Sequence, residues 1–243
     1  MTGKFALAAM AALGAFASLP AIAQEKSAHT FTGNAALATD YIFRGISQTG
    51  EEPAVSAGFN YGHTSGIFLG VWGSNVDFND GDQAHLEIDV FGGIRRDYRG
   101  ATWELGLIHY AYPGATDNRS YDYDEVRLAL GYDFTFVAAT ASVNYSPNYF
   151  ADSGTGVYYA LELKAPLKLA YSPSLIAGIG RQTIEKNARF GTRDYTDWRI
   201  GITVPVAGFD LSATYFDTSL NRTECANTEN CDARGVLAIS KAF

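Results

Sequence analysis

Residues 39–49 read TDYIFRGISQT, and the fold depends on which face of this stretch meets water. Successive side chains of a β-strand point to opposite faces. An acid and a base, Asp40 and Arg44, therefore share one face, while two aromatic rings, Tyr41 and Phe43, share the other. In a soluble sandwich the charges would face solvent. In a membrane barrel they would point into the lumen and the rings would point into lipid.

The N-terminal segment predicts export. It reads MTGKFALAAMAALGAFASLPAIAQ, with Lys4 followed by an apolar run over 5–16 and an A-x-A site at 21–23. The run is too short to span a bilayer, and the pattern is typical of a secretory signal peptide. We expect residues 1–23 to be removed and the mature chain to be a single outer-membrane barrel domain over 24–243.

The charge balance limits the class of partner. The formal net charge is −8, and Lys4 is the one charged residue of the signal segment. An acidic chain is repelled by nucleic acid and by anionic membrane surfaces. We therefore expect no nucleic-acid partner.

The two cysteines, Cys225 and Cys231, lie near the C-terminus in the window 218–235, TSLNRTECANTENCDARG. An even count in an exported protein indicates a disulfide. The window has no histidine, and we favour a structural disulfide over a metal site or two free thiols. The spacing predicts a small disulfide loop between two strands.

The periodicity of the mature chain is two almost throughout, which predicts an all-β fold of about twelve strands. Each candidate is close to the length that a tilted strand needs to cross a bilayer. The expected strands are 31–44, 53–61, 67–75, 85–94, 102–111, 124–133, 136–145, 156–164, 175–182, 195–204, 208–216 and 234–243.

The connections alternate between short and long. Short links at 62–66, 135 and 205–208 alternate with longer polar ones at 77–83, 113–121, 146–155 and around the cysteines. Up-and-down outer-membrane barrels have short periplasmic turns and long external loops. The link after Lys164, APLKLAYSPS, is longer than a periplasmic turn should be.

The two faces of the strands differ in composition. One alternating set is apolar, as in Leu86, Ile88 and Val90, and the other carries charges. In a barrel the charged set would line the lumen. The candidate pore-lining residues are Asp40, Arg44, Glu87, Asp89, Glu104, Glu125, Arg127, Glu162, Lys164, Asp197 and Arg199.

Aromatic residues recur where the apolar face approaches a strand end, which is typical of interfacial girdles. The last strand, GVLAISKAF at 235–243, ends on Phe243 with Leu237 and Ile239 on the same face. It resembles the C-terminal signal that barrel-assembly machinery recognises, although Lys241 interrupts the apolar pattern.

Four stretches carry a resemblance to a known family: ALATDYIFRGISQT at 36–49, GVWGSNVDF at 70–78, YAYPG at 110–114 and YSPNYF at 145–150. They resemble the TorF-like family of proteobacterial outer-membrane porins over essentially the whole mature chain. DYIFRGISQT is the most specific of them. The resemblance implies an outer-membrane barrel with a porin function and implies no particular substrate.

On this interpretation Tyr41 and Phe43 lie at the outer lipid interface, and Asp40 and Arg44 face the lumen near its outer mouth. We expect the two charges to form a salt bridge that holds the wall, in preference to a substrate site. Gly45 then lets the chain turn.

An enzymatic barrel is the competing class. Of the four histidines, His109 lies well inside a strand on the expected lipid face, where a lipid-modifying enzyme would place a base. Asp77, Asp80 and Asp82 offer a weak calcium hypothesis, since Gly81 comes one residue too early for an EF-hand loop. We expect no catalytic residue, no metal and no cofactor.

The sequence therefore predicts an up-and-down antiparallel transmembrane β-barrel in the outer membrane of a Gram-negative bacterium. The expected partners are outer-membrane lipid, lipopolysaccharide, the assembly machinery and small hydrophilic solutes that diffuse passively. Glu87 and Asp89 have no base between them, which favours a modest preference for cations. A non-conducting structural or adhesive barrel and a lipid-modifying enzyme remain the alternatives.

Overall fold

The structure is a computed structural model that describes residues 27–78, 81, 84–116 and 119–243. The expected signal peptide and two of the three aspartates of the weak calcium hypothesis, Asp80 and Asp82, lie outside the described residues. Within the described part, no group of three or more histidine, cysteine, aspartate or glutamate side chains is arranged to hold a metal ion.

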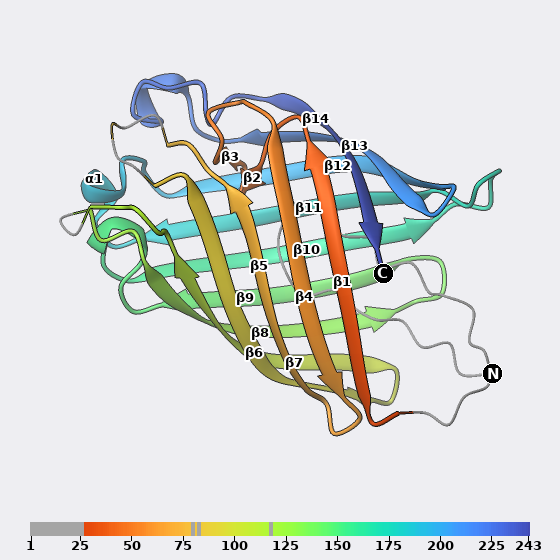
Figure 1. Ribbon diagram of the computed structural model, residues 1–243. Helices are drawn as coiled ribbons and strands as arrows, with labels where there is room; N and C mark the ends of the chain where they lie inside the picture. The colour runs from red at the N-terminus through yellow and green to blue at the C-terminus, as the bar shows by residue number, and fades with distance from the viewer. Residues whose placement is uncertain (1–26, 79–80, 82–83, 117–118) are drawn as a thin grey trace.

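Twelve antiparallel strands close into a barrel, in the order β1-β14-β13-β12-β11-β10-β9-β8-β7-β6-β5-β4 (Figure 1). All neighbours in the barrel are consecutive wall strands except for the closing pair β1 and β14. The wall strands are β1 (His29–Ala38), β4 (Ala54–His63), β5 (Ile67–Asn75), β6 (Leu86–Tyr98), β7 (Ala101–Ala111), β8 (Tyr123–Asp133), β9 (Ala138–Ser146), β10 (Gly156–Pro166), β11 (Ser174–Ile184), β12 (Tyr195–Val206), β13 (Phe209–Thr218) and β14 (Arg234–Ala242). This confirms the predicted fold.

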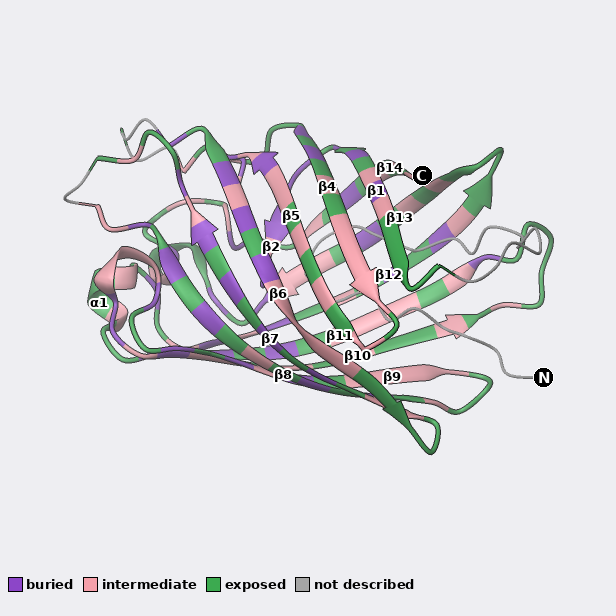
Figure 2. Ribbon diagram, turned by 60° about the horizontal axis from the view of Figure 1, so that its bottom comes forward, coloured by how far each residue is buried: buried purple, intermediate pink, exposed green. Residues whose placement is uncertain are grey.

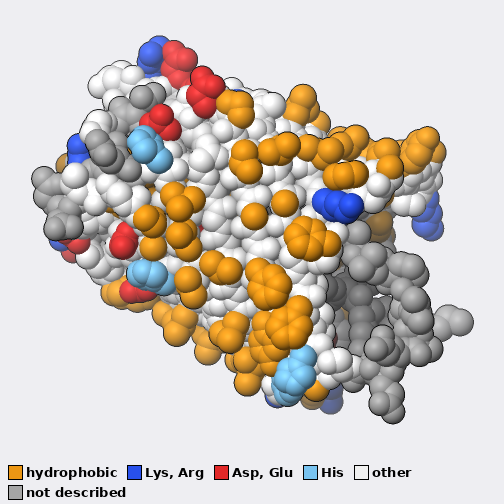
Figure 3. Space-filling view, in the orientation of Figure 1, with side chains coloured by type: hydrophobic (Ala, Val, Ile, Leu, Met, Phe, Trp, Pro, Cys, Tyr) orange, Lys and Arg blue, Asp and Glu red, His pale blue; other side chains and the backbone are white. Residues whose placement is uncertain are grey.

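Alternation between the two faces explains why these segments form a wall. Buried and exposed residues alternate along the strands (Figure 2), as a period of two requires. Apolar side chains dominate the outer face, where Leu107 is 65% exposed and Leu128 is 57% exposed. Hydrophobic side chains spread over the face formed by β1, β4, β5 and β6 (Figure 3). Soluble monomers rarely expose apolar surface on this scale.

The two ends of the barrel differ. One end has short connections, such as 64–66, 99–100 and 207–208, and we name it the turn end. The other, the loop end, carries the longer connections, with the helix α1 (Asn187–Phe190) and the 3₁₀ turns η1 (Phe150–Asp152) and η2 (Arg222–Glu224). The predicted alternation is thus confirmed, and the long link at the turn end covers 167–173. Among the described residues, no helix is long and apolar enough to cross a membrane.

The closing seam joins the two ends of the described chain. The amide of Gly33 donates to the carbonyl of Phe243 at 2.7 Å, and the amide of Phe243 donates back at 2.9 Å. The Phe243 ring lies so close that a Cβ on Gly33 would come within 2.4 Å of it. Glycine is therefore required at this position for the ring to cover the backbone.

The first strand differs from the prediction. The sequence predicts a strand over 31–44, but β1 ends at Ala38 and the chain then turns into the barrel. We name residues 39–53 the inward loop. It contains the two-stranded sheet β2 (Ile42–Phe43) and β3 (Ile46–Ser47), which pair with each other and not with the wall. The reversal between them uses positive φ angles of 50° at Arg44 and 82° at Gly45.

The core of the molecule therefore lies inside the barrel, toward the loop end. Buried tyrosines of the wall and loops pack there against the inward loop and against rings from neighbouring connections. Phe78, Tyr112, Tyr121 and Phe150 contact one another with ring centroids 4.4–6.1 Å apart. These rings fill much of the interior at the loop end.

The predicted disulfide is confirmed. Cys225 and Cys231 are bonded to each other in the connection between β13 and β14, and both are buried. The carbonyl of Cys231 accepts a hydrogen bond of 2.9 Å from the Thr218 hydroxyl at the end of β13. This hydrogen bond holds the disulfide loop against the end of β13.

Candidate functional site

Arg44, at the tip of the inward loop, reaches across the lumen to the far wall. Its guanidinium donates to both carboxylate oxygens of Glu125 on β8, at 2.6 and 2.8 Å, and to the side-chain oxygen of Gln182 on β11 at 2.8 Å. It also lies over the rings of Phe43 and Tyr158, with its carbon 4.7 and 4.4 Å from the ring centres. One nitrogen, Nη2, makes both contacts with Glu125, and Nη1 makes the contact with Gln182. Charge-assisted contacts of this kind fix the geometry of the loop.

Gly45 lies directly against the wall. A Cβ at this position would come within 2.6 Å of Thr218 and 2.7 Å of Asp197. A side chain would therefore collide with β12 and β13, and the positive φ angle also favours glycine. The expectation that Gly45 permits a turn is confirmed, and close packing adds a second reason for glycine.

Asp40 anchors the opposite end of the inward loop. One carboxylate oxygen accepts hydrogen bonds from Ser47 at 2.7 Å and Thr49 at 2.8 Å, and the other accepts from Arg234 on β14 at 3.0 Å. The expectation that Asp40 and Arg44 pair with each other is wrong. Each faces the barrel interior and finds its partner on the wall, because β2 and β3 separate the two side chains.

The prediction for the two rings is also wrong. Tyr41 is buried, and its hydroxyl donates to Glu87 on β6 at 2.8 Å. Phe43 packs edge-on against Tyr110 of β7, with ring centroids 5.8 Å apart. A strand running to position 44 would have put both rings on the outer face. The chain leaves the wall at Thr39, so the alternation no longer applies and both rings point into the lumen.

Glu87 and Asp89 form a buried acidic pair on β6. Each residue is only 1% exposed. Glu87 accepts the bond from Tyr41, but its Oε2 atom and the Oδ1 atom of Asp89 have no hydrogen-bond partner among the described residues. No described basic side chain forms an ion pair with either. The inward loop covers this pair, where the prediction expected open water.

Toward the turn end, further charges lie on the inner face and form pairs between strands. Glu104 on β7 accepts from Arg95 on β6 at 2.5 Å and from Arg127 on β8 at 3.3 Å. Arg127 also donates to Asn144 at 3.0 Å. A second bridge joins Arg199 on β12 to Glu162 on β10.

Lys164 follows Glu162 in the same alternating set and is exposed near the turn end. All the strand-borne candidates of the sequence thus fall on the inner face, and the sequence reasoning missed Asn144, Tyr158 and Gln182. These three residues lie on the inner face of their strands, so the period of two could have identified them.

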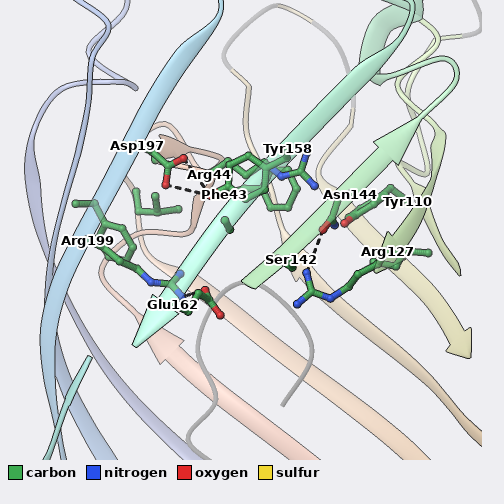
Figure 4. Close-up of a pocket in the computed structure, with 15 residues that line it drawn as sticks. Phe43, Arg44, Tyr110, Arg127, Ser142, Asn144, Tyr158, Glu162, Asp197 and Arg199 are labelled. Carbon is green, nitrogen blue, oxygen red and sulfur yellow. Dashed lines mark hydrogen bonds and ion pairs between the residues drawn. The ribbon is translucent and has the colours of Figure 1, made fainter. Parts of the chain in front are cut away.

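A cavity of about 50 Å³ lies beneath the inward loop. By a requirement of about 10–15 Å³ per water, it accommodates only a few water-sized groups. Figure 4 shows charged side chains converging on it from several strands. The lining residues include Arg44, Arg127, Ser142, Asn144, Tyr158, Glu162, Asp197 and Arg199.

His109 lies on the outer face, apart from this cavity. Its Nδ1 atom is 2.8 Å from the Asp124 carboxylate across the β7–β8 pair. The two side chains are 49% and 74% exposed. The prediction that His109 faces outward is confirmed.

Comparison with known proteins extends these observations. No curated protein matches the chain. Among solved structures, one described as "Unveiling the Mechanism Behind the in-meso Crystallization of Membrane Proteins" is 10% identical, covers 87% of this chain and 83% of its own, and has a TM-score of 0.50. LpxR from Salmonella typhimurium is 10% identical over 87% and 99%, with a TM-score of 0.47. A porin refined at 1.8 Å is 12% identical over 88% and 100%, with a TM-score of 0.43.

Because the sequence identity is only 10%, the similarity to the first of these structures shows a shared barrel fold and nothing about function. A family model described as "Bacterial protein of unknown function (Gcw_chp)" matches residues 22–243. The description of this family model does not bear on the TorF-like name that the sequence resemblance suggests. The match covers nearly the entire chain, and the protein belongs to the Gcw_chp family of bacterial proteins.

Proposed function

We propose that this chain is a narrow, porin-like channel of the bacterial outer membrane through which small hydrophilic solutes diffuse passively. The observation that carries the proposal is the set of charged side chains on the inner face of the barrel toward the turn end. There Arg95, Arg127, Glu162, Lys164 and Arg199 line a lumen that stays partly accessible to solvent. A charged side chain that lacks its own partner of opposite charge is stable on an interior face only where water reaches it. A water-filled, conducting lumen provides that environment.

The outer face supports the membrane location. A continuous apolar surface around a closed barrel, with all strand edges paired, is what a bilayer requires of a β structure. In this orientation the loop end faces the cell exterior, and the turn end and both chain ends face the periplasm. The signal peptide expected at 1–23 and contact with lipopolysaccharide belong to the same proposal.

The inward loop would set the narrowest part of the channel. Arg44 crosses the lumen to Glu125 and Gln182, and a small polar cavity lies beneath it. A solute that occupies this cavity would be limited to a few heavy atoms. The uncompensated pair Glu87 and Asp89 favours cations over anions near the loop.

A channel fits the chemistry better than an enzyme. His109 and Asp124 are open to the surroundings of the outer face. A catalytic base acts on a reacting group that is held beside it in a site that limits water. We therefore propose no catalytic role for this contact.

A non-conducting structural barrel is the second candidate, and the buried contact of Arg44 with Glu125 favours it. Single-channel recording of the purified, refolded protein in planar bilayers separates the two. The channel proposal expects discrete, small unit currents. Bilayers that show no current although the protein is inserted and folded would overturn it and support the structural barrel.

A further inference from the structure

The cavity beneath the inward loop has walls of opposite charge. Figure 4 shows Arg127 on one side and Asp197 on the other, with Tyr158 between them. Arg44 also lines the cavity, but Glu125 neutralises it. The character of the cavity therefore depends on the charges that remain on the two walls.

Beside the cavity, Arg95, Arg127 and Glu104 together carry one surplus positive charge. The acidic pair Glu87 and Asp89 belongs to the same wall but does not line the cavity. The guanidiniums of Arg95 and Arg127 share the single carboxylate of Glu104. Arg127 uses one further nitrogen to donate to the amide oxygen of Asn144, a neutral group. A guanidinium presents five N–H donors, so Arg127 keeps donors for a ligand in the cavity that it lines.

The opposite wall carries one surplus negative charge. Asp197 on β12 accepts hydrogen bonds from the Tyr158 hydroxyl at 3.0 and 3.2 Å, which supply no positive charge. No described basic side chain lies within ion-pair distance of Asp197. The nearby Arg199 is engaged by Glu162 instead. A buried carboxylate without a cationic partner favours a cation beside it.

We infer that the cavity is a binding site for a compact zwitterion, with an ammonium against Asp197 and a carboxylate against Arg127. The inference rests on the proposed channel function and names the class of solute that it favours. A volume of about 50 Å³ limits the ligand to the size of the simplest amino acids.

A zwitterion satisfies both walls at once, which a singly charged solute does not. A small carboxylate would contact Arg127 but leave Asp197 uncompensated. A small ammonium would do the reverse. Complementarity to two opposite charges is a source of specificity because each wrong ligand brings an unpaired or repelled charge.

Isothermal titration calorimetry on the refolded protein in detergent tests the inference with glycine as the probe. Three compounds serve for comparison. Acetate carries only the negative charge, methylammonium carries only the positive charge, and glycolamide carries neither. Glycine should bind about tenfold more tightly than each of them, because each loses at least one charge-assisted hydrogen bond. Equal binding of glycine and glycolamide, or no binding of glycine, would overturn the inference.

Two variants assign the contacts. Asp197→Asn should abolish the preference for glycine over acetate, and Arg127→Gln should abolish the preference for glycine over methylammonium. Arg127→Lys keeps the charge and should retain part of that preference. The matched controls are Asp217→Asn and Arg181→Gln on the outer face of β13 and β11, which should bind as the wild type does. Folding of every variant is checked by its heat-modifiable mobility in gel electrophoresis.

The outcomes separate this inference from the channel proposal. Currents without preferential glycine binding would leave the channel standing and refute the zwitterion site. Glycine binding without current would support the site within a non-conducting barrel and refute the channel. If Asp217→Asn changes the preference as much as Asp197→Asn does, the assignment to the cavity is wrong.

Discussion

Arg44 and Glu125, which are 81 positions apart in the sequence, form an ion pair across the lumen in which one guanidinium nitrogen contacts both carboxylate oxygens. The two side chains are only 4% and 1% exposed. Removal of one partner of such a pair leaves an uncompensated buried charge, so the pair determines whether the inward loop stays against the wall.

We expect Arg44→Met to lower the free energy of unfolding by about 3–5 kcal/mol, because Glu125 is left buried without its base. The double variant Arg44→Met, Glu125→Met should lose less than the single one. Urea unfolding from lipid vesicles, followed by tryptophan fluorescence, measures both. Arg222→Met, which breaks the exposed pair with Glu229, is the control and should change stability by less than about 1 kcal/mol. Equal losses in all three would contradict this role.

Gly45 provides a test of loop packing. Gly45→Ala adds a Cβ within 2.7 Å of two wall residues, so the loop must shift and the unit conductance of the channel should change. Gly208→Ala is a matched control, since Gly208 has φ +81° against +82° but no atom within 4 Å of its Cβ position. Both variants share the strain of a positive φ, so a difference between them reports the contact alone. Identical currents and stabilities would show that the loop does not pack as described.

Glu87 and Asp89 should govern ion preference. In the double variant Glu87→Gln, Asp89→Asn, the reversal potential across a salt gradient should move toward zero, because the uncompensated carboxylates are removed. High salt should reduce the difference, since screening acts over about 8–10 Å. Asp124→Asn on the outer face is the control. A wild-type channel that prefers anions would be inconsistent with this expectation.

The disulfide should stabilise the loop that carries it. For a loop this short, the chain-entropy relation predicts that the double variant Cys225→Ser, Cys231→Ser lowers the free energy of local loop opening by about 2 kcal/mol. Hydrogen exchange of residues 219–233 in the variant and the wild type measures it.

The same loop should lie on the cell surface. An epitope inserted at Asn227 should bind antibody on intact cells. Antibody binding only after permeabilisation would place this loop on the periplasmic side.

The contact between Arg193 and Glu224 gives a pH dependence outside the membrane-spanning strands. A hydrogen bond of 2.6 Å from Arg193 lowers the pKa of Glu224 below its ordinary 4.5. The folded pKa is depressed, so the contact stabilises the loops fully above pH 4.5 and is lost as the pH falls through the folded value. Carbon-13 NMR of the Glu224 carboxyl should show a midpoint below 4.5 that rises toward it in Arg193→Gln. Arg189→Gln, which contacts Asp152 instead, should leave the midpoint unchanged.

Much of the barrel could be predicted because its determinants are local. A period of two, short turns and an apolar outer face specify the strands one by one. Eleven of the twelve agree with their expected ranges within four residues at each end, and the first ends six residues early. The same alternation placed Glu104, Glu125 and Arg127 on the inner face correctly. The turn between β8 and β9 was predictable because few residues join two clear strands.

The inward loop could not be predicted in this way. DYIFRG keeps the alternation of a strand, but Arg44 finds Glu125 and Gln182 through contacts that are distant in sequence. Periodicity describes which side of a strand a residue occupies only while the chain remains in the sheet. The partners of Asp40 and Arg44 depend on the closed barrel, and no local pattern encodes them.

The bonds between Gly33 and Phe243 belong to the seam that β14 must complete before the barrel is closed. Until the last strand is in place, β1 and β13 each present a row of unpaired amide and carbonyl groups, which is a template for pairing with another chain and costly in lipid. A chain truncated before β14 would retain both open edges. The seam therefore couples the two strands that β14 joins, because neither β1 nor β13 is paired on both edges without it.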